Sequence, residues 1–307
     1  MRKLILSALI VLFSTTAQAQ STVYVTRDIS PESLIKIYKA LGRKAKGRVA
    51  VKVSTGEAGN PNYLQPALIG KLVKKVKGTI VECNTAYPGK RNTVEEHMRV
   101  AEEHGFTKIA KVDIMDAEGE FRIPVRDTAN IKYDLVGVGL KNYDFMVNLS
   151  HFKGHPMGGL GGAIKNQSIG VASAGGKAYI HAAGNRKDID RHIGFLESMA
   201  AAAQGVADYF GDRIIYINVM NNMSVDCDCV AHPAAPVLKD YGILASLDPV
   251  ALDQACVDII FNMTATEDNN NEPLKKRITS LHGTHTIDHA EKIGLGSKKY
   301  TLVNIDR

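Results

Sequence analysis

Short β-branched runs alternate with helical patterns along most of this 307-residue chain. Residues 22–26 (TVYVT), 48–54 (RVAVKVS) and 79–84 (TIVECN) have the composition of strands, and each is followed by an amphipathic stretch with a helical period. A strand, a crossover helix and a further strand form the pattern of a parallel sheet. The sequence therefore predicts an α/β fold, in which a mainly parallel sheet with crossover helices forms three layers.

The same alternation continues toward the C-terminus. A long helix is expected from about residue 187 to residue 210, and a shorter one over residues 285–295 (HTIDHAEKIGL). The helix starts have local signals, because Ser30-Pro31 and Asp248-Pro249 each place a capping side chain before a proline. Further strands are expected at residues 144–150, 213–220, 242–247 and 300–305.

The first nineteen residues have the features of a secretory signal. A basic start (MRK) precedes the apolar run LILSALIVLF, and Ala17-Gln18-Ala19 is a small-x-small cleavage site. The run is shorter than the roughly 20 residues that span a bilayer, which favours cleavage before Gln20 over a retained anchor. We expect residues 20–307 to form an exported α/β domain, periplasmic or secreted; a division into lobes at residues 20–150 and 151–307 stays open.

The charge of the chain disfavours nucleic acid as a partner. The whole chain has 38 basic and 32 acidic side chains, so removal of Arg2 and Lys3 with the signal leaves 36 against 32, a net charge of +4. The lysines are spread along amphipathic segments, and the interleaved aromatic residues of a nucleic-acid surface are missing. No membrane contact is expected after signal cleavage, and the oligomeric state is not indicated.

One polar, glycine-rich stretch, HFKGHPMGGLGGAIKNQ (residues 151–167), directly follows a predicted strand. In open α/β sheets, catalytic groups lie in the loops at the carboxyl ends of strands. We expect the catalytic residues of this stretch to be His151, Lys153, His155 and Lys165, with a histidine transferring protons and the lysines binding an anion. A metal at the two histidines stays open, because Gly154 and Pro156 disfavour the helix that their spacing requires.

The expected substrate contacts come from this stretch and from the loop after VAVKV. The glycines let the backbone approach a ligand, and they lead into a helix whose free N–H groups favour an anion. Neighbouring parallel strands end side by side, which places the second loop at the same cleft. The alternative is a structural role, with glycines packing helix on strand and histidines capping. The expected substrate-binding set is Glu57, Asn60, Gly158, Gly159, Gly161, Gly162 and Asn166.

The stretch SVDCDCVAHP (residues 224–233) places two thiols near a histidine. Thiolates at i and i+2 with an imidazole suit a soft metal or an iron–sulfur centre. A disulfide from one thiol of the pair to Cys83, or two free thiols, are the alternatives; a bond within the pair is not expected, since it would close a very small loop. The expected metal ligands are Cys227, Cys229, Cys83 and His232, and Cys256 is expected in the core.

Five blocks of the sequence, in order, resemble the uncharacterised iron–sulfur centre proteins of domain of unknown function 362 (DUF362). The resemblance covers nearly the whole mature chain and implies a metal- or iron–sulfur-associated core domain of unassigned reaction. The blocks are KVSTGEAGNPNYLQPALI, ECNTAYPGKRNTVEEHMRVAEEHGF, VNLSHFKGHPMGGLGGAIKNQSIGVASAGGK, DCDC and GILASLDPVALDQACVDII.

The chain also departs from that family in its cysteines. Typical members have a ferredoxin-like insert with two four-cysteine clusters after the block that matches SAGGKAYIH, whereas this chain continues without cysteine into the long helix. The resemblance therefore implies no ferredoxin-type clusters. A smaller resemblance, to the nickel-pincer lactate racemases, rests on His151, Gly158 to Gly162 and Lys165. We expect an exported protein of unassigned reaction, a metal- or iron–sulfur-associated redox or isomerase-type enzyme acting on a small anionic substrate; the alternative is a non-catalytic periplasmic anion- or metal-binding module.

We predict that the chain is processed during export. Intact-mass analysis of the protein from its native host should give a polypeptide that begins at Gln20, because the small residues before it form the cleavage site. A cytoplasmic protein that retains Met1 would contradict export.

Overall fold

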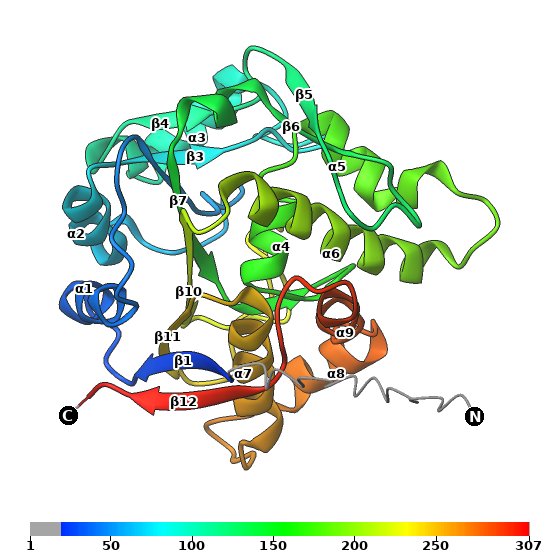
Figure 1. Cartoon of the computed structure of the whole chain (residues 1–307). Helices are drawn as coiled ribbons and strands as arrows, with labels where there is room; N and C mark the ends of the chain where they lie inside the picture. The colour runs from blue at the N-terminus through cyan, green and yellow to red at the C-terminus, as the bar shows by residue number, and fades with distance from the viewer. Residues whose placement is uncertain (1–19, 307) are drawn as a thin grey trace, which may run out of the picture.

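A computed structural model describes residues 20–306, so the predicted signal segment lies outside the described residues. Within them an eight-stranded sheet forms the centre of the molecule (Figure 1). Neighbouring strands pair in parallel except around β11, which is antiparallel to both of its neighbours. The prediction of a mainly parallel sheet is confirmed. In sheet order the strands are β12 (Tyr300–Asn304), β1 (Ser21–Thr26), β11 (Gly242–Ser246), β10 (Ile214–Met220), β7 (Phe145–His151), β2 (Val49–Lys52), β3 (Gly78–Glu82) and β4 (Val112–Ile114).

Helices cover both faces of this sheet, which confirms the three-layer α/β arrangement (Figure 1). One face is covered by α1 (Pro31–Ala40), α2 (Pro66–Val76) and α3 (Val94–Glu103). The other side carries α4 (Ala163–Ser168), α5 (Ala174–His181), α6 (Arg191–Phe210), α7 (Pro249–Asn262), α8 (Glu272–Ser280) and α9 (His285–Lys292). Short 3-10 turns lie at Phe106–Lys108, Val138–Asn142 and Ala183–Asn185.

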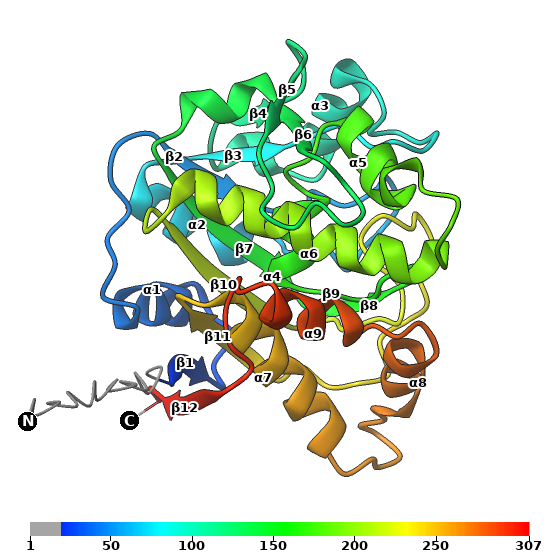
Figure 2. The same cartoon turned by 45° about the vertical axis from the view of Figure 1, so that its right-hand side comes forward.

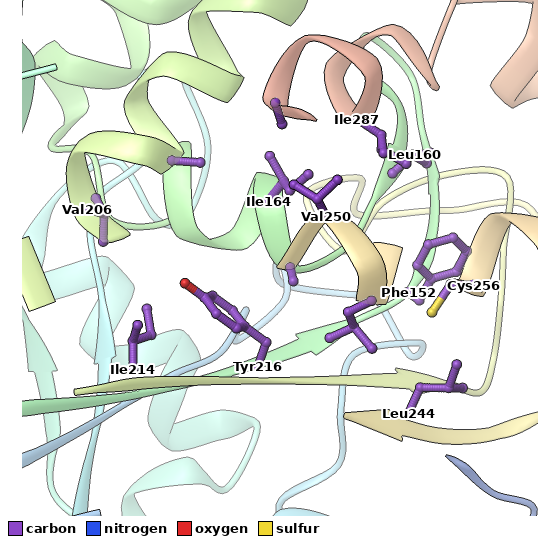
Figure 3. Packing of buried hydrophobic residues seen from close by; sticks show 14 of the residues in the cluster. Phe152, Leu160, Ile164, Val206, Ile214, Tyr216, Leu244, Val250, Cys256 and Ile287 are labelled. Carbon is purple, nitrogen blue, oxygen red and sulfur yellow. The ribbon is translucent and has the colours of Figure 1, made fainter. Parts of the chain in front are cut away.

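The strands of the sheet are apolar on both faces because successive side chains point in opposite directions. In β10, Ile215 and Ile217 pack with the helices α1 and α2. Ile214 and Tyr216 face the other way, toward the core that contains Ile164 of α4. Figure 3 shows this second core, in which α4, α6 and α7 pack over β10 and β11. The unbroken apolar run of β10 is therefore explained by burial on both sides.

The predicted helix starts are confirmed at two positions. Ser30 accepts a hydrogen bond from the Ser33 amide at the start of α1, and Asp248 accepts from Val250 and Ala251 at the start of α7. These side chains satisfy amide groups that a helix leaves unpaired at its first turn. Among residues 20–306, no helix combines the length and the apolar character needed to cross a membrane.

Two short hairpins lie beside the main sheet in the described part of the chain. In one, β5 (Glu120–Ile123) pairs with β6 (Asp134–Gly137), and neither strand is among those expected from the sequence. The glycine-rich stretch was expected as a loop, and part of it forms β8 (Lys153–His155) and β9 (Gly159–Gly161).

The sheet order brings four strand ends together. Strands β10, β7, β2 and β3 are consecutive neighbours and run in the same direction. Their carboxyl ends therefore lie at one edge, below the β8–β9 hairpin that Figure 2 shows beside α8 and α9. The chain on both sides of residue 150 contributes to this edge, because β2 and β3 precede that position, β7 spans it and β10 follows it.

Candidate functional site

The loops at this edge enclose a cavity of about 340 Å³. Lys52 ends β2, Glu82 ends β3, His151 ends β7, and Asp228 lies in the loop after β10. This is the place where open α/β sheets hold their ligands.

The structure brings the four predicted catalytic residues to this one cavity. His151, Lys153, His155 and Lys165 all line it. Of the predicted substrate-binding residues, Gly161, Gly162 and Asn166 also line the cavity, whereas Glu57, Asn60, Gly158 and Gly159 do not. The roles expected for these residues stay predictions, since the geometry gives their positions only.

Glu57 and Asn60 support the walls of the cavity from behind. The Glu57 carboxylate accepts a hydrogen bond from the Lys90 amide at 2.9 Å and pairs with Arg91 at 3.4 Å. The Asn60 amide donates to the carbonyl oxygens of Val230, at 2.7 Å, and Cys227, at 3.3 Å. Both side chains therefore hold loops in place.

The glycines of the stretch serve close packing. Gly159 has φ of +74°, and a Cβ atom there would lie 2.7 Å from the Cα of Gly283. At Gly162 a Cβ would lie 2.4 Å from a carboxylate oxygen of Asp253. A larger residue at either position would need the neighbouring chain to move.

The start of α4 does not offer free amides to an external anion. The amides of Ala163 and Ile164 donate to the Asp253 carboxylate at 2.8 and 2.9 Å. Burial raises the pKa of Asp253 to about 6, although these amides and Asn218 act in the opposite direction. The expectation that these helix amides bind a ligand is wrong, because a buried side chain of α7 already occupies them.

The Asp228 carboxylate joins the cysteine loop to the β7–β8 region. One oxygen accepts from His151 Nδ1 at 2.8 Å and the other accepts from Lys153 Nζ at 2.6 Å. Its backbone carbonyl accepts from the Glu57 amide at 2.7 Å. Burial alone would raise the pKa of Asp228, but the charges of Lys153 and His151 hold it well below its usual range. Asp228 is therefore a buried carboxylate that holds three loops together.

His151 has no free nitrogen for proton transfer. Its Nδ1 faces Asp228, and its Nε2 lies 2.6 Å from the carbonyl oxygen of Asn221. Both neighbours are acceptors, so the ring donates at both nitrogens only as the imidazolium. Both ring nitrogens of His151 are therefore occupied by protein acceptors.

His155 has a different protonation pattern. Its Nδ1 accepts from the amides of Met157, at 3.2 Å, and Gly158, at 2.8 Å. The proton of the neutral ring is therefore on Nε2. Burial, and then the charge of Lys165, lower the pKa of His155 well below its usual range. His155 is thus a neutral ring with one N–H available as a donor.

Lys165 is the cavity cation without a protein partner. Among residues 20–306, no hydrogen bond or salt bridge of its Nζ is found, whereas Lys52 pairs with Glu82 at 2.9 Å and Lys153 pairs with Asp228. Burial, and then the charge of Lys153, lower the pKa of Lys165 to about 7. Lys177 has no carboxylate partner either, and its Nζ donates to the Ala172 carbonyl at 2.6 Å.

The cysteine loop corrects one sequence expectation. Cys227 and Cys229 form a disulfide, so the prediction that the pair would not bond to each other is wrong. The small ring is accommodated because the Cα atoms are 5.2 Å apart, within the usual range for a disulfide. The prediction of a bond to Cys83 is wrong as well: Cys83 is a buried free thiol that donates to the Val171 carbonyl.

The metal ligands expected here are only partly brought together. A ring nitrogen of His155 and the sulfurs of Cys227 and Cys229 lie within 4.8 Å of one another, whereas Cys83 and His232 are not part of that group. Burial raises the pKa of the Cys83 thiol to about 12, and His232 is exposed. In this oxidised state the group does not fit a metal, because the sulfurs are bonded to each other and the His155 proton lies on Nε2.

Several charged residues of the cavity were not among the predicted site residues, among them Lys52, Lys177 and Asp228. Lys52 and Lys177 are buried lysines, and Asp228 lies between the two cysteines. Lys52 had a signal in the sequence, because a lysine ends the otherwise apolar run VAVK. The contacts of Asp228 had none, since its partners His151 and Lys153 are distant in the chain.

A family model described as domain of unknown function (DUF362) matches residues 49–258, which is 210 of the 307 residues. The chain belongs to the DUF362 family. The matched range contains every cavity residue described above, and the family resemblance of the sequence is confirmed. No curated protein matches this DUF362 chain.

Two solved structures resemble this DUF362 protein at low identity. The lactate racemase apoprotein from Thermoanaerobacterium thermosaccharolyticum has a TM-score of 0.42 and 16% identity, over 65% of this chain and 50% of that one. A crystal structure of a protein from Thermotoga maritima has a TM-score of 0.42 and 12% identity, over 85% of this chain and 58% of that one. The DUF362 chain therefore spans between 50% and 58% of these proteins.

We predict that Asp228→Asn strongly destabilises the protein. The change leaves Lys153 as a buried cation without a carboxylate and removes an acceptor from His151, which should cost about 3–5 kcal/mol in chemical denaturation at pH 7. The folded-state pKa of Asp228 is depressed, so its contribution is present above the unfolded pKa of about 3.9 and is lost as the pH falls toward the folded value. The difference between variant and wild type should therefore shrink in acid.

Asp226→Asn is the matched control. Asp226 lies in the same loop and pairs with Arg277 at 3.2 Å, with both side chains partly exposed. This change should cost about 1 kcal/mol or less. Equal effects of the two substitutions would contradict the role given to Asp228.

We also predict the state of the cysteines. Alkylation of the unfolded, unreduced protein should modify Cys83 and Cys256 only, and prior reduction should expose Cys227 and Cys229 as well, as read by peptide mass spectrometry. Alkylation of all the cysteines without reduction would contradict the disulfide.

Proposed function

We propose that the cavity is the active site of an enzyme that acts on a small anionic substrate, with Lys165 as the residue that moves a proton. The observation that carries the proposal is a half-buried lysine without a partner in a cavity with an excess of cations. Two carboxylates, Glu82 and Asp228, line the cavity, against five cationic side chains: Lys52, Arg91, Lys153, Lys165 and Lys177.

The cations divide into paired and unpaired groups. Lys52, Arg91 and Lys153 are neutralised by Glu82, Glu57 and Asp228. Lys165 and Lys177 face the cavity without a carboxylate, so an anionic ligand gains most by approaching them. A carboxylate or phosphate bound there takes the place of the water that would otherwise solvate the ammonium groups of Lys165 and Lys177.

The depressed pKa of Lys165 supports proton transfer. A pKa of about 7 gives comparable amounts of amine and ammonium near neutral pH, which is the condition that favours a general base and acid. His155 can donate its N–H to a ligand in the same cavity. His151 cannot, because both of its ring nitrogens are hydrogen-bonded within the protein. We assign proton transfer to Lys165, which accepts the proton as the amine and returns it as the ammonium. The neutral ring of His155 donates a hydrogen bond, and Lys177 binds the anion together with Lys165 in its charged form. The reaction class is an isomerisation or another proton transfer.

The proposal predicts a pH-dependent affinity for anions. Oxalate and inorganic phosphate should bind several-fold more weakly at pH 8 than at pH 6 in calorimetry, because Lys165 loses its charge as the pH rises through about 7. Lys165→Met should weaken binding at pH 6 and remove most of this pH dependence. Lys165→Arg should bind at both pH values, because arginine stays charged. If the affinity of Lys165→Met for these anions kept the pH dependence of the wild type, the role assigned to Lys165 would be wrong.

Deuterium exchange separates an enzyme from a binding module. Wild-type protein in D₂O should exchange the proton next to the carboxylate of at least one member of a panel of small carboxylic acids, as followed by NMR. Lys165→Arg should bind that acid without exchanging its proton. Binding without exchange for every acid would support the alternative, a non-catalytic anion-binding module.

A second candidate function is redox chemistry at the disulfide, because Cys227 and Cys229 line the same cavity. Reduction by a thiol consumes two electrons and two protons and frees both sulfurs, which then suit a soft metal together with a deprotonated nitrogen of His155. Anaerobically reduced protein that carries stoichiometric metal, lost in a Cys227→Ser/Cys229→Ser variant, would favour this candidate. Metal-free protein in both cases would exclude it.

A further inference from the structure

We propose a second metal site, for a divalent ion of the zinc type, at Glu197, His285 and His289, on the side of the molecule where α9 packs against α6. Their ligand atoms lie within 4.8 Å of one another. None of these residues lines the cavity described above.

The ligand geometry fits a small ion. Glu197 Oε1 lies 3.2 Å from His285 Nε2 and 3.5 Å from His289 Nδ1. In a tetrahedral site with bonds of about 2.0–2.1 Å, two ligand atoms are roughly 3.3 Å apart. One carboxylate and two imidazoles, with a fourth position left for water, form a ligand set typical of zinc.

Local structure explains why these side chains meet. His285 and His289 are four residues apart on the helix α9, which places them on the same face. Glu197 lies in the first half of α6, which packs against α9. His192 Nε2 lies 3.0 Å from the Leu281 carbonyl at the end of α8, and the Gln204 amide donates to the carbonyl of Ile293, directly after α9, at 2.6 Å. The positions of the ligands are therefore fixed by packed helices.

The surrounding hydrogen bonds point to an ion at the centre. His289 Nε2 lies 2.7 Å from Asp127 Oδ2, which leaves Nδ1 as the nitrogen that faces Glu197. The second Glu197 oxygen accepts from the Asn130 amide at 2.8 Å. Metal-binding histidines typically donate their other N–H to a carboxylate, which fixes the tautomer and makes the free nitrogen more basic.

Two carboxylate side chains, Glu197 and Asp127, lie beside the two imidazoles. Glu197 and His285 are partly exposed, with side-chain exposures of 23% and 34%, so an ion has a path from solvent.

The test uses residues 20–307 carrying Cys227→Ser/Cys229→Ser, which removes the thiols of the other cluster. After chelator treatment, this protein should bind one Zn²⁺ in calorimetry, and Zn²⁺ should raise its melting temperature. His285→Ala and Glu197→Gln should each lower the Zn²⁺ affinity at least tenfold. Asp127→Asn should lower it about 10- to 100-fold, because Asp127 acts through His289.

His232→Ala in the same background is the matched control, since His232 is an exposed histidine outside the cluster. It should leave the Zn²⁺ affinity unchanged. Absence of Zn²⁺ binding in the Cys227→Ser/Cys229→Ser protein would overturn the proposal. Binding that survives His285→Ala would overturn it as well. Relative to the Cys227→Ser/Cys229→Ser parent, anion binding at Lys165 should not change in His285→Ala, Glu197→Gln or Asp127→Asn, so failure here is distinguishable from failure of the proposed function.

Discussion

The contact on which the site depends most is that of the Asp228 carboxylate with His151 and Lys153. It joins the loop after β10 to the end of β7, two segments about 75 residues apart in the chain. The carboxylate pairs with Lys153 and occupies Nδ1 of His151, whose Nε2 faces the Asn221 carbonyl, so neither ring nitrogen is free. His151, which opens the glycine-rich stretch, therefore has a structural role. Lys165 and His155 are the cavity residues that can contact a ligand.

Partners, more than depth of burial, decide the charge states in the cavity. Desolvation disfavours the charged form of both Glu82 and Lys165. Glu82 nevertheless stays charged near neutral pH, whereas Lys165 becomes titratable there. Burial would raise the pKa of Glu82, but Lys52, His97 and Arg91 outweigh it and bring the pKa to about 2, so Glu82 stays charged. Lys165 has no such partner, and burial lowers its pKa to about 7. An unpaired group that remains titratable near neutrality is the one suited to proton transfer.

Much of the fold could be predicted from local sequence, while the site could be predicted only in part. The strands and the starts of α1 and α7 follow from periodicity and capping residues that lie within a few positions of one another. The β8–β9 hairpin could not be predicted, because it depends on the approach of Gly159 to Gly283. The role of Asp253 was missed for the same reason, since its amide partners lie about 90 residues away. Loop position identified Lys165 and His155, but it did not distinguish cavity residues from supports such as Glu57.

Two histidine pairs show how secondary structure changes the meaning of one spacing. His151 and His155 are four residues apart, but the chain between them is extended, and the two rings bind different partners. His285 and His289 have the same spacing on a helix, and both face the Glu197 carboxylate. The sequence HTIDH within a predicted amphipathic helix was therefore the clearer metal signal of the two, although it lacks the glycines and lysines that mark a ligand-binding loop. The spacing of histidines indicates a shared ligand only after the helix or strand that contains them is known.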